Sequence, residues 1–184
     1  MCKVSAELIS DFQTNGYILL REVAASEEIS FYRPLIKKAV YKYSTETRKL
    51  SERNTYGKAF LQITNLWERD EQVKKFVFAR KFAQIAADLL GVEKVRLYHD
   101  QALFKEAKGG PTPWHQDQFY WNLDTPKTIT MWMPLVDVSV ESGLMKFADK
   151  SHQKGLYESI TISDKSDEIY SETIAKEGFE VSQS

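Results

Sequence analysis

Apolar residues recur at helical spacing near the start of the chain and predict two amphipathic helices. The first covers residues 5–12, with Ser5 as its N-cap and Gly16 as a left-handed stop after its last turn. The second covers residues 26–43, where apolar positions repeat every three or four residues. Pro34 lies inside that second pattern, and we expect it to kink or split the helix.

The hydrophobic period changes at Gly91. Two helical segments follow Glu71 and end at this glycine, whereas polar and apolar residues alternate from 95 to 105 as in a strand. Further runs of strand-forming residues predict strands at 17–20, 114–121, 128–135 and 144–148. Helices followed by regularly spaced strands indicate an α+β fold with a mainly β core, in which helices pack outside an antiparallel sheet or barrel.

Two segments give weaker patterns. Residues 44–66 are polar and then mixed, and no element is assigned to them. The tail from Glu158 to Ser184 holds 7 acidic residues against 2 lysines and shows no strong period, which predicts a surface excursion or a mobile arm. No internal repeat or linker divides the chain, so we expect residues 1–184 to form a single domain.

The candidate chemistry lies in a short aromatic run that follows a Gly-Gly-Pro-Thr-Pro turn at 109–113. His115 and Asp117 are two residues apart in this run, so an extended strand would place both side chains on one face. An imidazole and a carboxylate on one face are two of the three ligands of the facial triad of non-haem Fe(II) oxygenases. A His-x-Asp tripeptide alone is a weak signal, and the polar face of a strand is the alternative.

Composition changes this picture little. Hydrophobic content of 42% and charged content of 28% are ordinary for a globular protein. A net charge of −1 gives no reason to expect nucleic acid or an anionic membrane as a partner. The single cysteine, Cys2, excludes an intramolecular disulfide and a cysteine metal cluster and fits a cytoplasmic protein. No apolar run approaches the roughly 20 residues of a membrane helix.

Four stretches, in this order along residues 12–155, carry a family resemblance. They are a helix-Gly-Tyr-strand opening at 12–20, a strand at 99–105, the His-x-Asp motif at 114–118 and a Gly-x-Leu…Ser-His turn at 143–152. Together they resemble the phytanoyl-CoA dioxygenase family of Fe(II)/2-oxoglutarate oxygenases. Lys150 departs from the pattern, because the family usually has glycine there.

The resemblance implies that His115 and Asp117 ligate Fe(II). It also implies that 2-oxoglutarate and O2 are co-substrates and that an unactivated C–H bond of a small organic or acyl substrate is hydroxylated. A carboxylate at position 117 favours hydroxylation, since the related halogenases have a small residue there. The sequence alone does not identify the substrate.

The resemblance further implies a double-stranded β-helix, the jelly roll of cupin-like proteins, and a set of co-substrate contacts. Gln101, Lys105 and Trp132 fall where the family contacts 2-oxoglutarate, and Gln62 is a weaker candidate for the same role. The strand period supports part of this set independently, because positions 101 and 105 share a face.

The two other histidines have structural alternatives to a role at the metal. His99 would share a face with Gln101, but a hydrogen-bonded core histidine is the commoner case. His152 lies in the Ser-His turn and is interpreted as a residue that fixes this loop. The aromatic residues at 114 and 119–121 are interpreted as pocket wall and core.

The family also has a second histidine ligand and an arginine for 2-oxoglutarate downstream of the Ser-His turn. Here no histidine follows His152 and no arginine follows Arg96. We therefore expect the natural protein to continue past Ser184 with these residues and with the strands that complete the sheets. Residues 1–184 alone are then expected to be inactive. The alternative is a non-catalytic jelly-roll binding module that has lost its metal centre.

Overall fold

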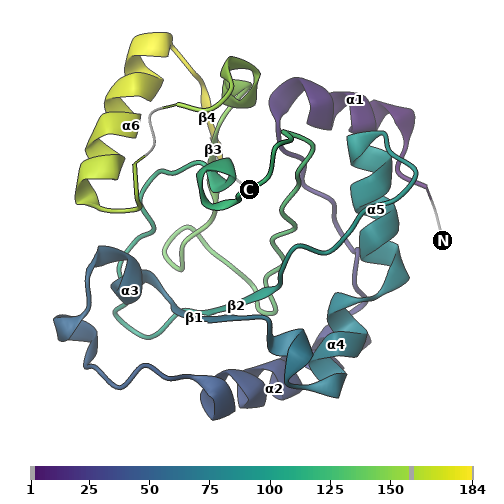
Figure 1. Cartoon of the computed structure of the whole chain (residues 1–184), viewed down its shortest axis with the longest axis vertical. Helices are drawn as coiled ribbons and strands as arrows, with labels where there is room; N and C mark the ends of the chain where they lie inside the picture. The colour runs from purple at the N-terminus through teal and green to yellow at the C-terminus, as the bar shows by residue number, and fades with distance from the viewer. Residues whose placement is uncertain (1–2, 158–159, 184) are drawn as a thin grey trace.

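Helices surround two small antiparallel sheets in the computed structural model, which describes residues 3–157 and 160–183 (Figure 1). The α+β class predicted from the sequence is confirmed. Cys2 and the two ends of the predicted tail, Glu158 and Ser184, lie outside the described residues. Among the described residues, none of the helices combines the length and the apolar composition that a membrane span requires.

The first helix, α1 (Ala6–Asn15), has the caps that the sequence predicts. The Ser5 side chain accepts a hydrogen bond from the Leu8 N–H, which satisfies one of the free donors of the first turn. Gly16 adopts φ 87°, a left-handed conformation that is cheap for glycine, and its N–H donates to the Phe12 carbonyl. Both local signals are therefore confirmed.

The loop around His152 closes the C-terminal end of α1, where carbonyls lack helical partners. Lys150 N–H donates to the Asn15 carbonyl at 3.0 Å, and Gln153 Nε2 donates to the Thr14 carbonyl at 2.9 Å. The Nε2 atom of His152 lies 3.1 Å from the Gln13 carbonyl. The interpretation of His152 as a loop-fixing residue is confirmed.

Helix α2 (Ser26–Tyr43) is one element of 18 residues, so the expectation that Pro34 splits it is wrong. Packing on both sides of the proline explains why the helix survives. Tyr32 contacts the ring of Phe76 at 4.8 Å, and Ala39 and Val40 are almost fully buried. Burial of this apolar side offsets the hydrogen bond that Pro34 cannot donate.

The helices before residue 91 also agree with the sequence. They are α4 (Glu71–Val77) and α5 (Arg80–Leu90). Asp70 caps α4 by accepting from the N–H groups of Gln72 and Val73, and Gly91 ends α5 in the left-handed conformation. Figure 1 shows α4 beside α2, and α5 beside α1.

Strands β1 (Leu61–Thr64) and β2 (Gln101–Phe104) form the first sheet and cover the core. Their register pairs Leu61 with Phe104 and Thr64 with Gln101. The buried face of this sheet packs on α2 and α4, in a core made of Ala39, Val40, Leu61, Ile63, Leu66 and Val73, with Ala102 and Phe104 beside it. Because side chains alternate along a strand, Gln62, Thr64, Gln101 and Leu103 share the opposite, exposed face.

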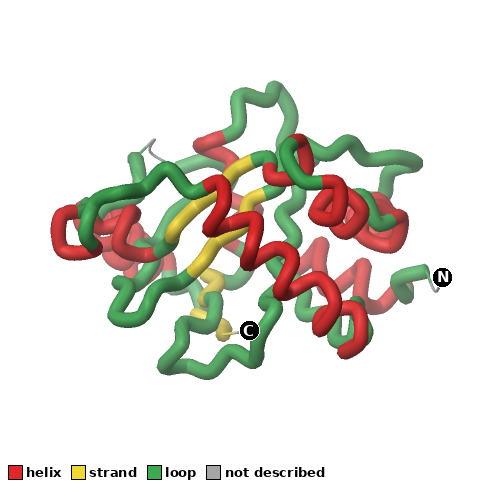
Figure 2. Tube along the Cα trace, turned by 90° about the horizontal axis from the view of Figure 1, so that it is seen from below, coloured by secondary structure: helices red, strands yellow, loops and turns green. Residues whose placement is uncertain are grey.

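The segment between α2 and β1, to which the sequence assigned no element, contains two short helices separated by loops. They are η1 (Leu50–Glu52) and α3 (Thr55–Ala59), and η2 (Leu66–Glu68) follows β1. Figure 2 shows the short strands in yellow, with helices and loops around them.

Several predicted strands are shorter than expected or absent. The strand expected at 95–105 is reduced to β2, and the one expected at 144–148 is reduced to β3 (Lys146–Ala148). The segments 17–20, 114–121 and 128–135 form no strand. A strand needs a ladder partner, and at 17–20 the contact is a side-chain one, in which Tyr17 stacks on Phe147 at 4.3 Å.

The tail, for which the sequence predicts a surface excursion or a mobile arm, carries regular secondary structure. Helix α6 (Asp164–Glu177) and strand β4 (Val181–Gln183) occupy it, and β4 pairs antiparallel with β3. Ser163 and Ser166 form a reciprocal capping box at the start of α6. Ser166 and Tyr170 are buried, so this helix is held at a few positions without a continuous apolar stripe.

The described strands form two sheets of two strands each. Their antiparallel pairing agrees with the prediction. The closed jelly roll implied by the family resemblance stays a prediction.

Candidate metal site

His115 and Asp117 lie together, but the geometry that joins them is not the strand that the sequence predicts. Asp117 begins a short 3-10 helix, η3 (Asp117–Tyr120), and Gln116 before it has an extended backbone. That one extended residue is enough to put its two neighbours on the same side. The Nε2 atom of His115 lies 3.3 Å from Oδ1 of Asp117.

Each of the two side chains is held by a further hydrogen bond. The Nδ1 atom of His115 lies 2.9 Å from the Pro113 carbonyl, which can only accept, so Nδ1 carries a hydrogen. The Thr130 hydroxyl donates to Oδ2 of Asp117 at 2.7 Å. The contact with Pro113 aims Nε2 at the carboxylate, and the contact with Thr130 leaves Oδ1 facing the imidazole.

The surroundings of the pair favour a protonated, positively charged His115 beside an ionised Asp117. Burial lowers the pKa of His115, but hydrogen bonds to Asp117 and Pro113 outweigh burial and raise it above its ordinary value. Burial raises the pKa of Asp117, but hydrogen bonds from His115 and Thr130 outweigh it and hold the pKa below its ordinary value. Both ring nitrogens of His115 face acceptors, which favours a positive charge at this position.

The distance between the two candidate ligand atoms fits a divalent metal bound by both of them. Metal–ligand bonds of about 2.1 Å at right angles would place neighbouring ligand atoms about 3 Å apart, and Nε2 and Oδ1 are 3.3 Å apart. A metal would take the place of the proton on Nε2, while Nδ1 kept its hydrogen bond. Within residues 3–157 and 160–183, the acidic, histidine and cysteine side chains form no group of three that could hold a metal ion.

Gln62 is connected to the site through Tyr56, a residue that the sequence did not single out. The Tyr56 hydroxyl donates to Oε1 of Gln62. Burial raises the pKa of Tyr56, and the charges of Tyr120 and Asp117 add to that rise, so Tyr56 lies within electrostatic range of the candidate ligand. Tyr56 comes from α3, in the segment left unassigned, and no sequence pattern pointed to it.

A cavity of about 480 Å³ adjoins this group. Tyr56 and Gln62 both line it, together with Arg48 and the residues 44–47. The Arg48 guanidinium is already paired with Glu46, through an Nη2–Oε2 distance of 2.6 Å. The wall of this cavity therefore carries little net charge and combines polar side chains with the apolar Phe60 and Leu61.

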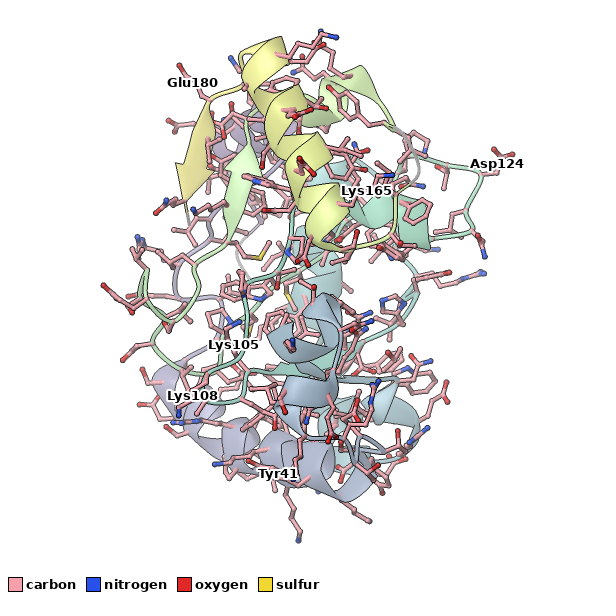
Figure 3. The ribbon with its side chains drawn as sticks, turned by 90° about the vertical axis from the view of Figure 1, so that its left-hand side faces the viewer. Tyr41, Lys105, Lys108, Asp124, Lys165 and Glu180 are labelled. Atoms are coloured by element: carbon pink, nitrogen blue, oxygen red, sulfur yellow. The ribbon has the colours of Figure 1, made fainter. Side chains whose placement is uncertain are left out.

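Lys105 contacts the backbone around the turn that precedes the metal motif. Its Nζ atom donates to the Gly110 carbonyl at 2.6 Å and more weakly to the Ala59 carbonyl at 3.4 Å. Partial burial lowers the pKa of its ammonium group. Figure 3 shows Lys105 midway along the molecule, between Tyr41 of α2 and Lys165 of α6.

The remaining candidates are less closely tied to the pair. Gln101 lies on the exposed face of β2, opposite Thr64. Trp132 is 38% exposed, and the hydrogen bonds and ring contacts of the described residues do not join it to His115 or Asp117. His99 is half-buried, and its charge contributes a small lowering of the Asp117 pKa.

Comparison with known proteins adds an independent finding. The model of the phytanoyl-CoA dioxygenase family matches residues 12–177. A protein of Stutzerimonas stutzeri, described as a probable alpha-ketoglutarate-dependent hypophosphite dioxygenase, is 23% identical over 159 residues. That alignment covers 83% of this chain and 55% of the relative, so the chain spans about half the length of the curated relative it matches.

Proposed function

Because the chain belongs to the phytanoyl-CoA dioxygenase family, we propose that it takes part in a 2-oxoglutarate-dependent oxygenase reaction with His115 and Asp117 as two ligands of Fe(II). One observation carries the proposal. The Nε2 atom of His115 and the Oδ1 atom of Asp117 are 3.3 Å apart, and the other polar atom of each side chain forms a separate hydrogen bond. Such support from outside the ligand atoms is typical of metal ligands.

Each residue of the pair has a definite task in this proposal. His115 keeps its Nδ1 hydrogen on the Pro113 carbonyl and presents the Nε2 lone pair. Asp117 presents Oδ1, while Thr130 neutralises part of the charge on Oδ2. When bound, Fe(II) with 2-oxoglutarate and O2 would supply the oxidising power to hydroxylate an unactivated C–H bond. The third protein ligand would come from a residue outside this pair.

For 2-oxoglutarate we propose contacts from Gln101, Lys105, Trp132 and Gln62. The ammonium group of Lys105 has three hydrogens, two of them face backbone carbonyls, and the group lies 4.8 Å from the centroid of the Phe60 ring; the third hydrogen would bind a carboxylate. Lysine offers a point charge where the family uses the bidentate fork of arginine. We therefore expect residues 1–184 alone to bind Fe(II) and 2-oxoglutarate weakly and to form no succinate from them.

The substrate class that we propose is a small organic or acyl molecule, held in the cavity beside Tyr56 and Gln62. Its nearly neutral wall of polar and apolar groups favours a substrate without a strong charge. The jelly-roll fold and a cytoplasmic location belong to the same proposal. The relative's description names hypophosphite, a much smaller anion, but 23% identity is too low to transfer a substrate.

The test is metal binding, because it does not require turnover. Mn(II), a redox-stable stand-in for Fe(II), would be titrated into the protein and followed by the loss of the free-ion EPR signal. Asp117→Ala should abolish the weak saturable binding expected of the wild type, with little change in thermal stability, since a half-exposed side chain contributes little packing. Asp124→Ala is the matched control, an exposed carboxylate from the same loop region that should bind as the wild type does.

Equal Mn(II) binding by the wild type and Asp117→Ala would contradict the proposal. It would favour the alternative of a binding module without a metal centre.

A further inference from the structure

The backbone of the metal motif forms hydrogen bonds with the C-terminal tail, for which the sequence predicts a surface excursion or a mobile arm. Trp114, the residue before His115, donates its N–H to Oδ1 of Asp167 at 2.9 Å. Its carbonyl lies 3.3 Å from the hydroxyl of Ser166, a residue with no exposed surface. The first turn of α6 therefore contacts both the backbone N–H and the backbone carbonyl of the residue next to the candidate ligand.

Gln116, between the two candidate ligands, is held in a similar two-point manner. Its Nε2 donates to the Gly155 carbonyl at 3.0 Å, and its Oε1 accepts from the Tyr157 N–H at 2.8 Å. A side-chain amide that bonds backbone at both ends has its position and its rotation fixed. Tyr120, at the end of η3, adds a third anchor by accepting from the Ile162 N–H at 2.7 Å.

The residues before and between the two candidate ligands contact a different part of the chain from the ligands themselves. Trp114 and Gln116 face the ranges Gly155–Tyr157 and Ile162–Asp167, which we call the brace, whereas His115 and Asp117 face the candidate metal site. Figure 3 shows Lys165, in the first turn of α6, at the end of that helix nearest the middle of the molecule. Trp114 through its backbone and Gln116 through its side chain thus support the segment that carries the two candidate ligands.

The brace holds the motif by polar contacts and not by core packing. Between residues 106 and 157, Pro113 alone is buried, and the apolar core lies on the far face of β1–β2. Loss of one brace contact should therefore leave the core intact while the ligands lose their fixed separation. Partners that orient metal ligands without touching the metal typically change its affinity by about 10–100-fold when removed.

We propose that Gln116 and Asp167 are positioning residues, which set the geometry of His115 and Asp117 for the metal. The inference rests on the proposed function, because it assumes that these two residues bind a metal. It assigns a role to α6, an acidic surface helix that takes no other part in the site. Neither residue touches the metal, and both act through the backbone of the ligand segment.

The experiment compares Mn(II) affinity and melting temperature in four variants. Gln116→Ala and Asp167→Ala should each weaken Mn(II) binding by roughly tenfold or more at a nearly unchanged melting temperature. Asp167→Asn keeps an oxygen that can accept from the Trp114 N–H, so it should bind within about twofold of the wild type. Glu172→Ala, an exposed carboxylate on the same helix, should leave the affinity unchanged.

The outcomes separate this inference from the proposal on which it rests. If Asp117→Ala abolishes binding but Gln116→Ala and Asp167→Ala bind as the wild type does, the brace inference is overturned and the metal site stands. If Asp167→Asn binds Mn(II) as weakly as Asp167→Ala does, the charge of Asp167 matters and not its hydrogen bond. That result also overturns the brace inference. If Gln116→Ala does not fold, the two Asp167 variants decide alone. Unchanged binding in Asp117→Ala removes the proposed function itself.

Discussion

Two regions of this protein are stabilised by different interactions. In the region built from α2, α4 and the β1–β2 sheet, apolar side chains such as Leu66 and Val73 are fully buried against one another. In the region from 106 to 157, Pro113 alone is buried, and the chain is fixed by hydrogen bonds that Asp167 and Gln116 accept and that Thr130 donates. The first region sets the stability of the fold, and the second sets the geometry of the candidate site.

The largest effect that we predict is in the core. Leu66→Ala should destabilise the protein by about 2–5 kcal/mol, because it opens a cavity where the side chain has no exposed surface. Val140→Ala, at a position 64% exposed in the other region, should change stability by no more than about 0.5 kcal/mol. Urea unfolding of both variants tests the contrast, and similar losses would show that the two regions share one apolar core.

A smaller effect is expected where the two regions meet. The guanidinium of Arg53, whose side chain is 6% exposed, pairs with Glu106 just before the Gly109–Gly110 turn. Glu106→Gln should cost about 1–3 kcal/mol, since it removes the nearer of the two carboxylates that pair with this buried charge.

The exposed pair Glu93–Lys94 supplies the control, with side chains 86% and 84% exposed. Glu93→Gln should be close to neutral in the same unfolding experiment. A neutral Glu106→Gln would mean that the junction does not depend on this ion pair.

The smallest effect is a pH dependence in the loop that lines the cavity. Hydrogen bonds from Arg48 lower the pKa of Glu46 to about 2, from an ordinary value of 4.5. A depressed carboxyl pKa adds stability above the ordinary value, and this stability is lost as the pH falls from about 4.5 toward about 2. Glu46→Gln should remove that part of the acid sensitivity, so its stability should change less than that of the wild type between these pH values. An identical pH profile in both proteins would contradict the assignment.

The same contrast explains what the sequence could predict. Helices α1, α2 and α5 follow from local signals, namely apolar residues at helical spacing and the caps at Ser5, Gly16 and Gly91. The strand expected at 114–121 is wrong, because a strand depends on a partner elsewhere in the chain, and a period of two does not identify one. Helix α6 was missed because capping serines and single buried residues hold it in place of an apolar stripe.

The candidate site shows the same division. The meeting of His115 with Asp117 was predicted, and it survives the loss of the strand because Gln116 between them is extended. The contributions of Thr130, Tyr56 and Asp167 were not predicted, since each reaches the motif from a distant part of the chain. Such contacts are set by tertiary packing and leave no local period.

The most direct measurement of the central claim is the nitrogen coupling of bound Mn(II) in protein whose histidines are labelled with 15N. Pulsed EPR reports a histidine nitrogen that is bonded to the metal. We predict a single 15N coupling in the wild type, its loss in His115→Ala, and its persistence in His152→Ala, because His152 bonds to the end of α1. A coupling that survives in His115→Ala, or that disappears in His152→Ala while that variant stays folded, would contradict the assignment of His115 as the metal ligand.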